Sequence, residues 1–170
     1  MTGTRPDLDS LHLRRASRAL VVDPDDRILL VRFEFDTTVW ATPGGGIEPH
    51  ESPVDALRRE LREEVGLHEP EIGPVIWDMT RILIGRMGPW DGQHDLIHLV
   101  RAPRFEPQPA MSWEQLNAEN LWELRWWSLD EIEPATSDTV RFVPGPLAAL
   151  TRDLLRDGPP AEPVRIVHGR

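Results

Sequence analysis

The sequence predicts one α/β domain in which helices pack against a mixed β-sheet. The chain has 170 residues, enough for a single domain to bury a sizeable core. Its strand-like segments outnumber its helical ones, and the two types do not alternate as they do in a parallel doubly wound fold. The 39% hydrophobic and 28% charged residues are ordinary for a folded globular protein.

The first predicted elements are a hairpin and a short strand. Residues 17–23 (SRALVVD) and 27–35 (RILLVRFEF) are rich in Val, Ile, Leu and Phe, and the Asp and Pro residues between them favour a turn. A third, short strand over 38–42 (TVWAT) ends at Pro43, ahead of a run of glycines.

A helix follows the glycines. Ser52 is a suitable N-cap, Pro53 suits the first helical position, and Asp55 completes a weaker form of the capping box. Gly66 supplies the left-handed residue that ends the helix. The apolar residues at helical spacing, which predict a packed face, are Val54, Leu57, Leu61 and Val65.

The second half of the chain predicts further strands and a helix. Residues 74–84 (PVIWDMTRILI) and 95–105 (DLIHLVRAPRF) are strand-like, and the polar segment 85–94 (GRMGPWDGQH) predicts a loop between them. Residues 121–129 (LWELRWWSL) predict a strand that leads into a turn or short helix at 128–132.

The end of the chain predicts one helix and a tail. Residues 147–156 (LAALTRDLLR) form a short amphipathic pattern, with Gly158 beyond its end. The rest is rich in proline, so we expect a domain over residues 1–157 and a tail over 158–170.

Charge and composition exclude several classes of function. A formal charge of −10 argues against general nucleic-acid binding and against an anionic membrane surface, and a phosphate-bearing substrate would need help from a metal. The absence of cysteine excludes disulfides, thiolate zinc sites and thiol nucleophiles. No apolar run reaches the length of a signal peptide or a membrane span, so we expect a cytoplasmic protein.

The predicted helix carries three carboxylates close together. Glu60, Glu63 and Glu64 fall in a sector beside the apolar face, where like charges repel. Arg59 reaches Glu63 four residues on, but one arginine does not neutralise three carboxylates. A divalent cation would, and carboxylate oxygens select Mg²⁺ or Mn²⁺ over zinc. Taken alone, such a string is most often a solvated helix face.

The string is part of a longer pattern. Gly45, Glu51 and Arg59 are separated by five and seven residues, and the segment from Arg59 continues as Glu-Leu-x-Glu-Glu-x-Gly-Leu to residue 67. These residues occupy every fixed position of the Nudix box, so the chain resembles a MutT-like Nudix hydrolase. The resemblance is specific over residues 45–67 and looser over the flanking segments WATPGGGIE and RWWSLDEI.

The resemblance implies a fold and an activity. The fold is an α/β/α sandwich on a mixed sheet, with the box forming a loop, a helix and a second loop. The activity is Mg²⁺- or Mn²⁺-dependent hydrolysis of a nucleoside diphosphate linked to another moiety, in which water attacks phosphorus. The partner is then a small-molecule nucleoside diphosphate derivative, and a homodimer is compatible with the family.

The motif also implies roles for its residues. Glu60, Glu63 and Glu64 would hold the metal, and Arg59 would orient a glutamate through a salt bridge. Glu51 would support the loop, and either Glu60 or Glu64 would deprotonate the attacking water.

Residues around the box extend the candidate site. The carbonyl of Gly44 or Gly45 is expected as an extra metal ligand. Glu119 or Glu123 is expected to add a carboxylate from a loop before the last strand, unless both only solubilise that loop. His50 stands where many relatives have Gly, which predicts an unusual backbone angle at a surface residue.

Four residues are candidates for substrate binding. Trp40 and Trp90 could stack on a base, with packing as the alternative for each. Arg81 and Arg86 could contact phosphate or carboxylate groups, with a plain strand surface as the alternative.

Two other functions compete with hydrolysis. An isoprenoid diphosphate isomerase of this family would usually need a cysteine, which the chain lacks. A non-catalytic Nudix domain that senses a nucleotide or regulates a partner would be free to lose the carboxylates, and all of them are present.

Overall fold

The computed structural model describes residues 10–168, so the first nine residues of the expected domain and the last two of the expected tail lie outside it. The strands are β1 (Leu13–Val22), β2 (Ile28–Glu34), β3 (Thr38–Ala41), β4 (Gly44–Gly46), β5 (Val75–Met87), β6 (Trp90–Arg101), β7 (Leu121–Trp127), β8 (Val140–Val143) and β9 (Val164–His168). The helices are α1 (Pro53–Glu60), the π-helical turn η2 (Leu61–Val65), α2 (Trp113–Ala118), α3 (Leu129–Ala135) and α4 (Leu147–Asp157). No helix within the described range has the length and apolar character needed to cross a membrane.

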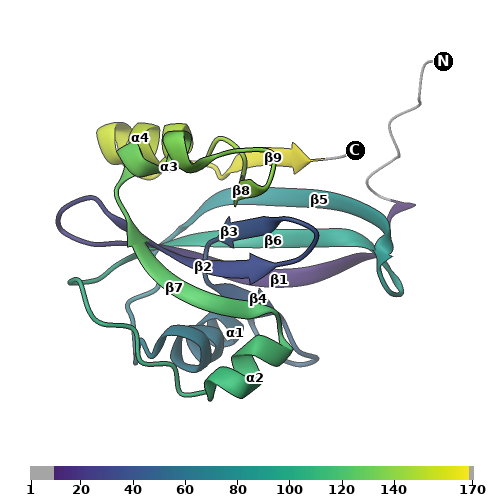
Figure 1. The fold of residues 1–170 in the computed structure, drawn as a ribbon. Helices are drawn as coiled ribbons and strands as arrows, with labels where there is room; N and C mark the ends of the chain where they lie inside the picture. The colour runs from purple at the N-terminus through teal and green to yellow at the C-terminus, as the bar shows by residue number, and fades with distance from the viewer. Residues whose placement is uncertain (1–9, 169–170) are drawn as a thin grey trace.

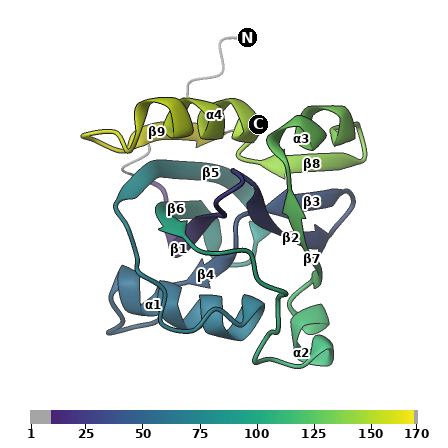
Figure 2. The ribbon, with the colours of Figure 1, turned by 90° about the vertical axis from the view of Figure 1, so that its left-hand side faces the viewer.

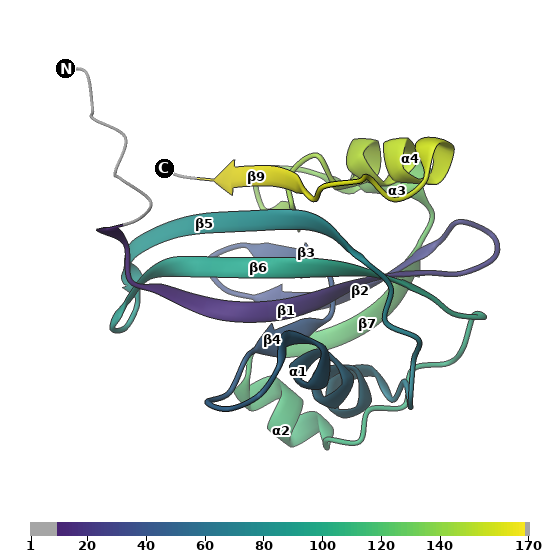
Figure 3. The ribbon, with the colours of Figure 1, turned by 180° about the vertical axis from the view of Figure 1, so that it is seen from behind.

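The strands form one mixed sheet. Its order is β8-β3-β2-β1-β6-β5-β9, with β4 paired to β1 and β7 paired to β2. The pairs β1–β6, β3–β8 and β5–β9 are parallel and the others are antiparallel. Figure 3 shows β1, β6 and β5 lying side by side, with β9 beyond β5.

Helices cover both faces of the sheet. In Figure 1, α3 and α4 lie above the strands and α1 and α2 lie below them, and the same layers are seen in the turned view of Figure 2. Successive side chains of β1 point to opposite faces of the sheet and so contribute to two cores. Leu20 and Val22 belong to the core under α3 and α4, whereas Ala19 and Val21 belong to the core over α1 and α2. The predicted α/β/α sandwich is therefore confirmed.

The predicted helix after Ser52 is present but is not α-helical throughout. Ser52 Oγ accepts a hydrogen bond from the Asp55 N–H (3.1 Å), and Gly66 ends the segment at a φ of 75°. After Glu60, however, the helix widens into the π-turn η2. The carbonyl oxygens of this turn accept backbone N–H groups from the segment 108–111 that crosses it, which favours the wider turn.

The predicted loop over 85–94 is wrong. Strand β5 continues to Met87 and β6 begins at Trp90, so only Gly88 and Pro89 lie between the strands. The polar residues of this stretch are strand residues, and Gln93 pairs with Arg81 in the ladder. Polarity predicted a loop here, but these side chains find polar partners in the sheet, such as Asp95 for Gln93 and Asp78 for His94.

The prediction of a tail after residue 157 is wrong for residues 164–168. These residues form β9, which pairs in parallel with β5 and packs Ile166 against the core. The helix before it, α4, lies where it is predicted, with Gly158 after its last residue. Three short elements, β4, α2 and β8, have too few residues to show a period and were not predicted.

Candidate active site

The glycine strand β4 meets the end of the box helix. The Gly44 N–H donates a hydrogen bond to Glu64 Oε2 (2.9 Å). A Cβ built on Gly45 would lie 2.6 Å from Glu60 Oε1, so only glycine permits this approach of backbone to carboxylate. The glycine strand therefore lies directly against the Glu60 and Glu64 carboxylates.

Strand β1 fixes the glycines from the other side. Gly44 and Gly45 pair with Arg18 and Ser17 in an antiparallel ladder. Gly44 has a φ of 126°, and a side chain on it would overlap the Ser17 carbonyl oxygen. The conformation and the close packing both require glycine at this position.

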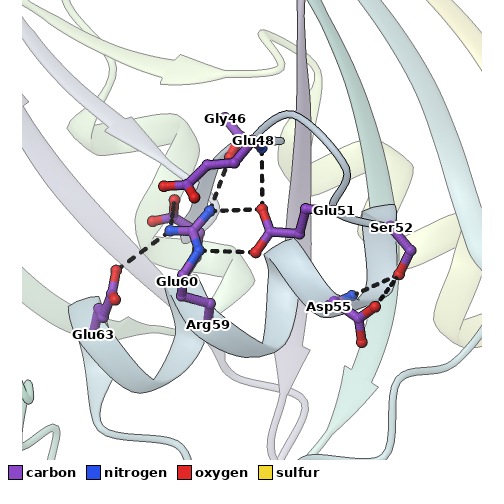
Figure 4. Close-up of polar contacts among 8 residues, drawn as sticks. All are labelled: Gly46, Glu48, Glu51, Ser52, Asp55, Arg59, Glu60 and Glu63. Atoms are coloured by element: carbon purple, nitrogen blue, oxygen red, sulfur yellow. Dashed lines mark hydrogen bonds and ion pairs between the residues drawn. The ribbon is translucent and has the colours of Figure 1, made fainter.

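Arg59 joins three glutamates, as Figure 4 shows. Its Nε and Nη2 donate to the two carboxylate oxygens of Glu51 (2.9 and 3.0 Å), and its Nη1 donates to Glu60 Oε1 (2.7 Å). Nη1 also lies 3.4 Å from Glu63 Oε2, and Nη2 donates to the Gly46 carbonyl oxygen (3.1 Å). The contacts raise the pKa of Arg59 and lower that of Glu51. The predicted salt bridge between Arg59 and a glutamate is thus present.

Of the three carboxylates, Glu64 is buried and Glu60 is half-buried. Glu64 is 5% exposed, and burial together with repulsion from Glu60 raises its pKa to about 8. Burial also raises the pKa of Glu60, although its contact with Arg59 opposes the shift. Glu63 is more exposed and faces Arg59 (Figure 4).

These residues suit a divalent cation in their chemistry. Over residues 10–168, no three His, Asp or Glu side chains converge as a ready-made metal cluster. Glu60 and Glu64 nevertheless present hard oxygen donors whose mutual repulsion a cation would relieve, next to backbone that glycine keeps open. The donor set therefore fits Mg²⁺ or Mn²⁺.

Of the two further acidic candidates, Glu119 lies nearer the carboxylates. It caps the C-terminus of α2, and its charge contributes to the raised pKa of both Glu60 and Glu64. Glu123 lies within β7 rather than in a loop, and its Oε2 is 3.2 Å from Arg32 Nε. His50 is exposed with a φ of 69°, which confirms the predicted backbone angle.

The substrate-binding candidates lie in different surroundings. Trp40 is 5% exposed and packs edge-on against Trp127 at 5.0 Å between ring centroids, which leaves little ring surface for a base. Trp90 opens β6 and lies 4.3 Å from the His12 ring. Arg86 is exposed near the end of β5.

Arg81 belongs to a buried ionic cluster that the sequence analysis missed. Its Nε donates to Asp95 Oδ2 (3.2 Å), while Asp95 Oδ1 accepts from Arg18 Nε (2.7 Å) and Gln93 Nε2 (2.6 Å). Arg18 also donates through Nη1 to the Thr42 carbonyl oxygen (2.9 Å). Asp95 was placed at the start of an apolar run, and only the pairing of distant strands brings it to the arginines.

Comparisons with known proteins agree with this geometry. The family model described as NUDIX domain matches residues 12–145. The RNA pyrophosphohydrolase of Campylobacter jejuni subsp. jejuni serotype O:2 is 36% identical over 80 residues, which are 44% of this chain and 51% of that protein. The RNA pyrophosphohydrolase of Sulfurovum sp. is 42% identical over 67 residues, 36% of this chain and 43% of that protein. The chain thus spans about half the length of these curated relatives.

Solved structures match over more of the chain. The solution structure of the E. coli ORF135 protein has a TM-score of 0.59 and 27% identity, covering 92% of this chain and 99% of that one. The MutT NUDIX hydrolase from Burkholderia pseudomallei has a TM-score of 0.59 and 21% identity, covering 79% and 94%. Because the family match includes the glycine strand and every carboxylate described above, the chain belongs to the Nudix family.

Proposed function

We propose that the protein is a metal-dependent pyrophosphohydrolase that cleaves a nucleoside diphosphate linked to another moiety. The observation that carries the proposal is that the buried Glu64 and the half-buried Glu60 lie together against the glycine strand. Two largely desolvated carboxylates that repel each other lower the stability of the fold unless a cation joins them, which favours a functional reason for their presence.

The metal would be Mg²⁺ or Mn²⁺, held by the carboxylates of the box. Glu60, Glu63 and Glu64 would be its ligands, and the carbonyl of Gly44 or Gly45 and the Glu119 carboxylate are the nearest additions. When bound, the cation would neutralise phosphate oxygens and promote attack by water.

The other residues of the box would position the carboxylates. Arg59 would hold Glu60 through its 2.7 Å contact while Glu51 holds Arg59 from the opposite side. Either Glu60 or Glu64 would accept the proton of the attacking water, since both lie beside the glycine strand.

The matched relatives guide the choice of substrates. Their name, RNA pyrophosphohydrolase, makes the phosphorylated 5′ end of an RNA one candidate, although the match covers less than half of this chain. The charge of −10 still disfavours general binding along a nucleic-acid backbone, so an RNA would be held through its 5′ end.

A substrate panel tests the proposal. We expect the purified protein to release phosphate-containing products from at least one nucleotide, nucleotide sugar, dinucleotide or capped or triphosphorylated RNA, only when Mg²⁺ or Mn²⁺ is present. Glu63→Gln should lower the rate by about a hundredfold or more, since it removes one charge from the cation site. Glu71→Gln is the control, because Glu71 is exposed and outside the box.

The panel also separates hydrolysis from the non-catalytic alternative. If no member were turned over with either metal while nucleotides still bound, the sensing function would replace the proposed one.

A further inference from the structure

Two arginines contact one aspartate on the sheet face that carries α3 and α4, and a third arginine lies on the same face. Arg14 and Arg81 both pair with Gln93 in the ladder of β1, β6 and β5, so the three side chains lie on one face. These strands are adjacent in Figure 3. Arg18 and Asp95 complete the group, which we call the arginine cluster: Arg14, Arg18, Arg81 and Asp95.

The cluster has more positive than negative charge. Asp95 is fully buried and both of its oxygens are occupied, by Arg18 and Gln93 on one side and Arg81 on the other. The neighbouring cations hold Asp95 ionised with a lowered pKa, although burial opposes this. Burial, together with repulsion from Arg18 and Arg14, lowers the pKa of Arg81. The cluster therefore contains three guanidinium groups and one carboxylate, which contacts two of them.

Most of the outer guanidinium nitrogens remain available. Arg81 uses only Nε, and Arg18 uses Nε and Nη1, so the remaining terminal nitrogens make no hydrogen bond with any described residue. Arg14 makes none in the same part of the chain, and it is exposed. Terminal nitrogens of Arg18 and Arg81 that are partly buried and make no hydrogen bond within residues 10–168 lower stability, which favours a functional reason for their presence.

The cluster adjoins the candidate metal site. Arg18 pairs directly with Gly44, whose N–H holds Glu64. The Arg14 guanidinium lies against Gly46, where a Cβ would overlap it. The charges of Glu64 and Glu60 also act on Arg18. Arg14 and Arg18 on β1 therefore adjoin the part of β4 that lies against the carboxylates.

We propose that the arginine cluster binds an additional phosphate group of the substrate, beyond the diphosphate that is cleaved. The inference rests on the proposed function and narrows its substrate class. Guanidinium groups match phosphate oxygens with paired hydrogen bonds, and a local positive site is unusual in a chain with a net charge of −10. Substrates with three or more phosphates should then be preferred over a diphosphate linked to a neutral group.

Binding without metal is the first test. Inorganic tripolyphosphate and orthophosphate are titrated calorimetrically into the whole protein in the presence of a chelator. We expect tripolyphosphate to bind in a salt-sensitive manner and Arg14→Gln to weaken it about tenfold or more, as for loss of a charged hydrogen bond. Arg101→Gln, on an exposed residue at the far end of β6, is the matched control.

Arg14→Gln removes the packing of the guanidinium against Gly46 but no hydrogen bond or ion pair within residues 10–168, so its effect separates ligand binding from structure. Arg81→Gln is the second variant, and circular dichroism with thermal melting establishes that it folds. If both variants fold and bind tripolyphosphate as the parent protein does, the cluster has only a structural role and the inference is wrong.

Kinetics provide the second test. For ATP we expect Arg14→Gln to raise KM about tenfold or more with kcat changed less than about threefold, and for ADP-glucose we expect little change in either constant. An equal effect on both substrates would contradict the inference while leaving the proposed hydrolysis intact. If the parent protein turned over no substrate, the proposed function would fail, and the metal-free titration would still decide whether the cluster binds phosphate.

Discussion

Glu64 is a buried carboxylate of the candidate metal site, and its burial raises its pKa. The unfolded chain loses the Glu64 proton near the ordinary pKa of 4.5, whereas the folded protein retains it up to a pKa of about 8. Between these values the folded state binds more protons, so the free energy of unfolding falls as pH rises. Glu60, whose pKa is also raised, acts in the same direction.

We therefore predict that the metal-free protein is less stable at pH 8 than at pH 5, and that Glu64→Gln reduces this loss. The measurement is thermal or urea unfolding across this pH range with a chelator present. Glu71→Gln should retain the full pH dependence of the parent protein. A pH dependence that Glu64→Gln leaves unchanged would show that Glu64 ionises normally in the fold.

At this scale, the sequence predicted what lies close along the chain. The contact of Arg59 with Glu63 follows from helical spacing, and the family resemblance predicted a salt bridge from Arg59 to a glutamate. That Glu60 and Glu51 also bind Arg59 was not predicted. The contact of Arg18 with Asp95 joins residues 77 positions apart. It depends on the register between β1 and β6, which no local pattern encodes.

In the box helix, too, the sequence predicted only the features that depend on residues close along the chain. Its cap at Ser52 and its end at Gly66 were predicted, because capping residues act within a few positions. The change to a π-turn at Leu61 was not, because the N–H groups of 108–111 that bond to the turn lie about 45 residues on.

A substitution at Gly66 tests how tightly the segment 108–111 packs against the end of the box helix. It has a φ of 75°, and a Cβ on it would overlap the Gln108 carbonyl oxygen. Gly88 also has a positive φ, of 58°, but a Cβ there would meet nothing within 4 Å. We predict that Gly88→Ala costs about 1 kcal/mol of stability for the backbone angle alone, and that Gly66→Ala costs about 1–3 kcal/mol more.

The comparison is made by urea unfolding of the two variants under identical conditions. Equal losses would mean that the 108–111 segment moves aside and that its hydrogen bonds do not hold the π-turn in place.

At the scale of the whole molecule, β9 extends the sheet beyond the region that the family model matches. That match ends at residue 145, whereas Val164–His168 adds the edge strand beside β5. Its five residues alternate only weakly and follow a proline-rich stretch, so composition alone predicted a tail. The mixed sheet and its two helical layers were predicted because the longer elements contain enough residues to show a hydrophobic period.

Substitutions at Ile166 and Val167 test how much β9 contributes to the free energy of unfolding. Ile166 packs against the core under α3 and α4, whereas Val167 is 48% exposed. We predict that Ile166→Ala lowers the free energy of unfolding by about 1–3 kcal/mol and that Val167→Ala changes it by less than about 0.5 kcal/mol. Equal, small effects in chemical unfolding would show that β9 pairs with the sheet without stabilising it.

The pairing of Arg18 with Gly44 has a thermodynamic consequence. One backbone position carries an arginine of the cluster, and its partner across the ladder holds Glu64 through an N–H. A phosphate bound by Arg18 and a cation bound by Glu64 would then lie on groups of opposite charge that the Arg18–Gly44 pair joins directly. Their affinities should be linked, and the factor by which tripolyphosphate tightens Mg²⁺ must equal the factor by which Mg²⁺ tightens tripolyphosphate.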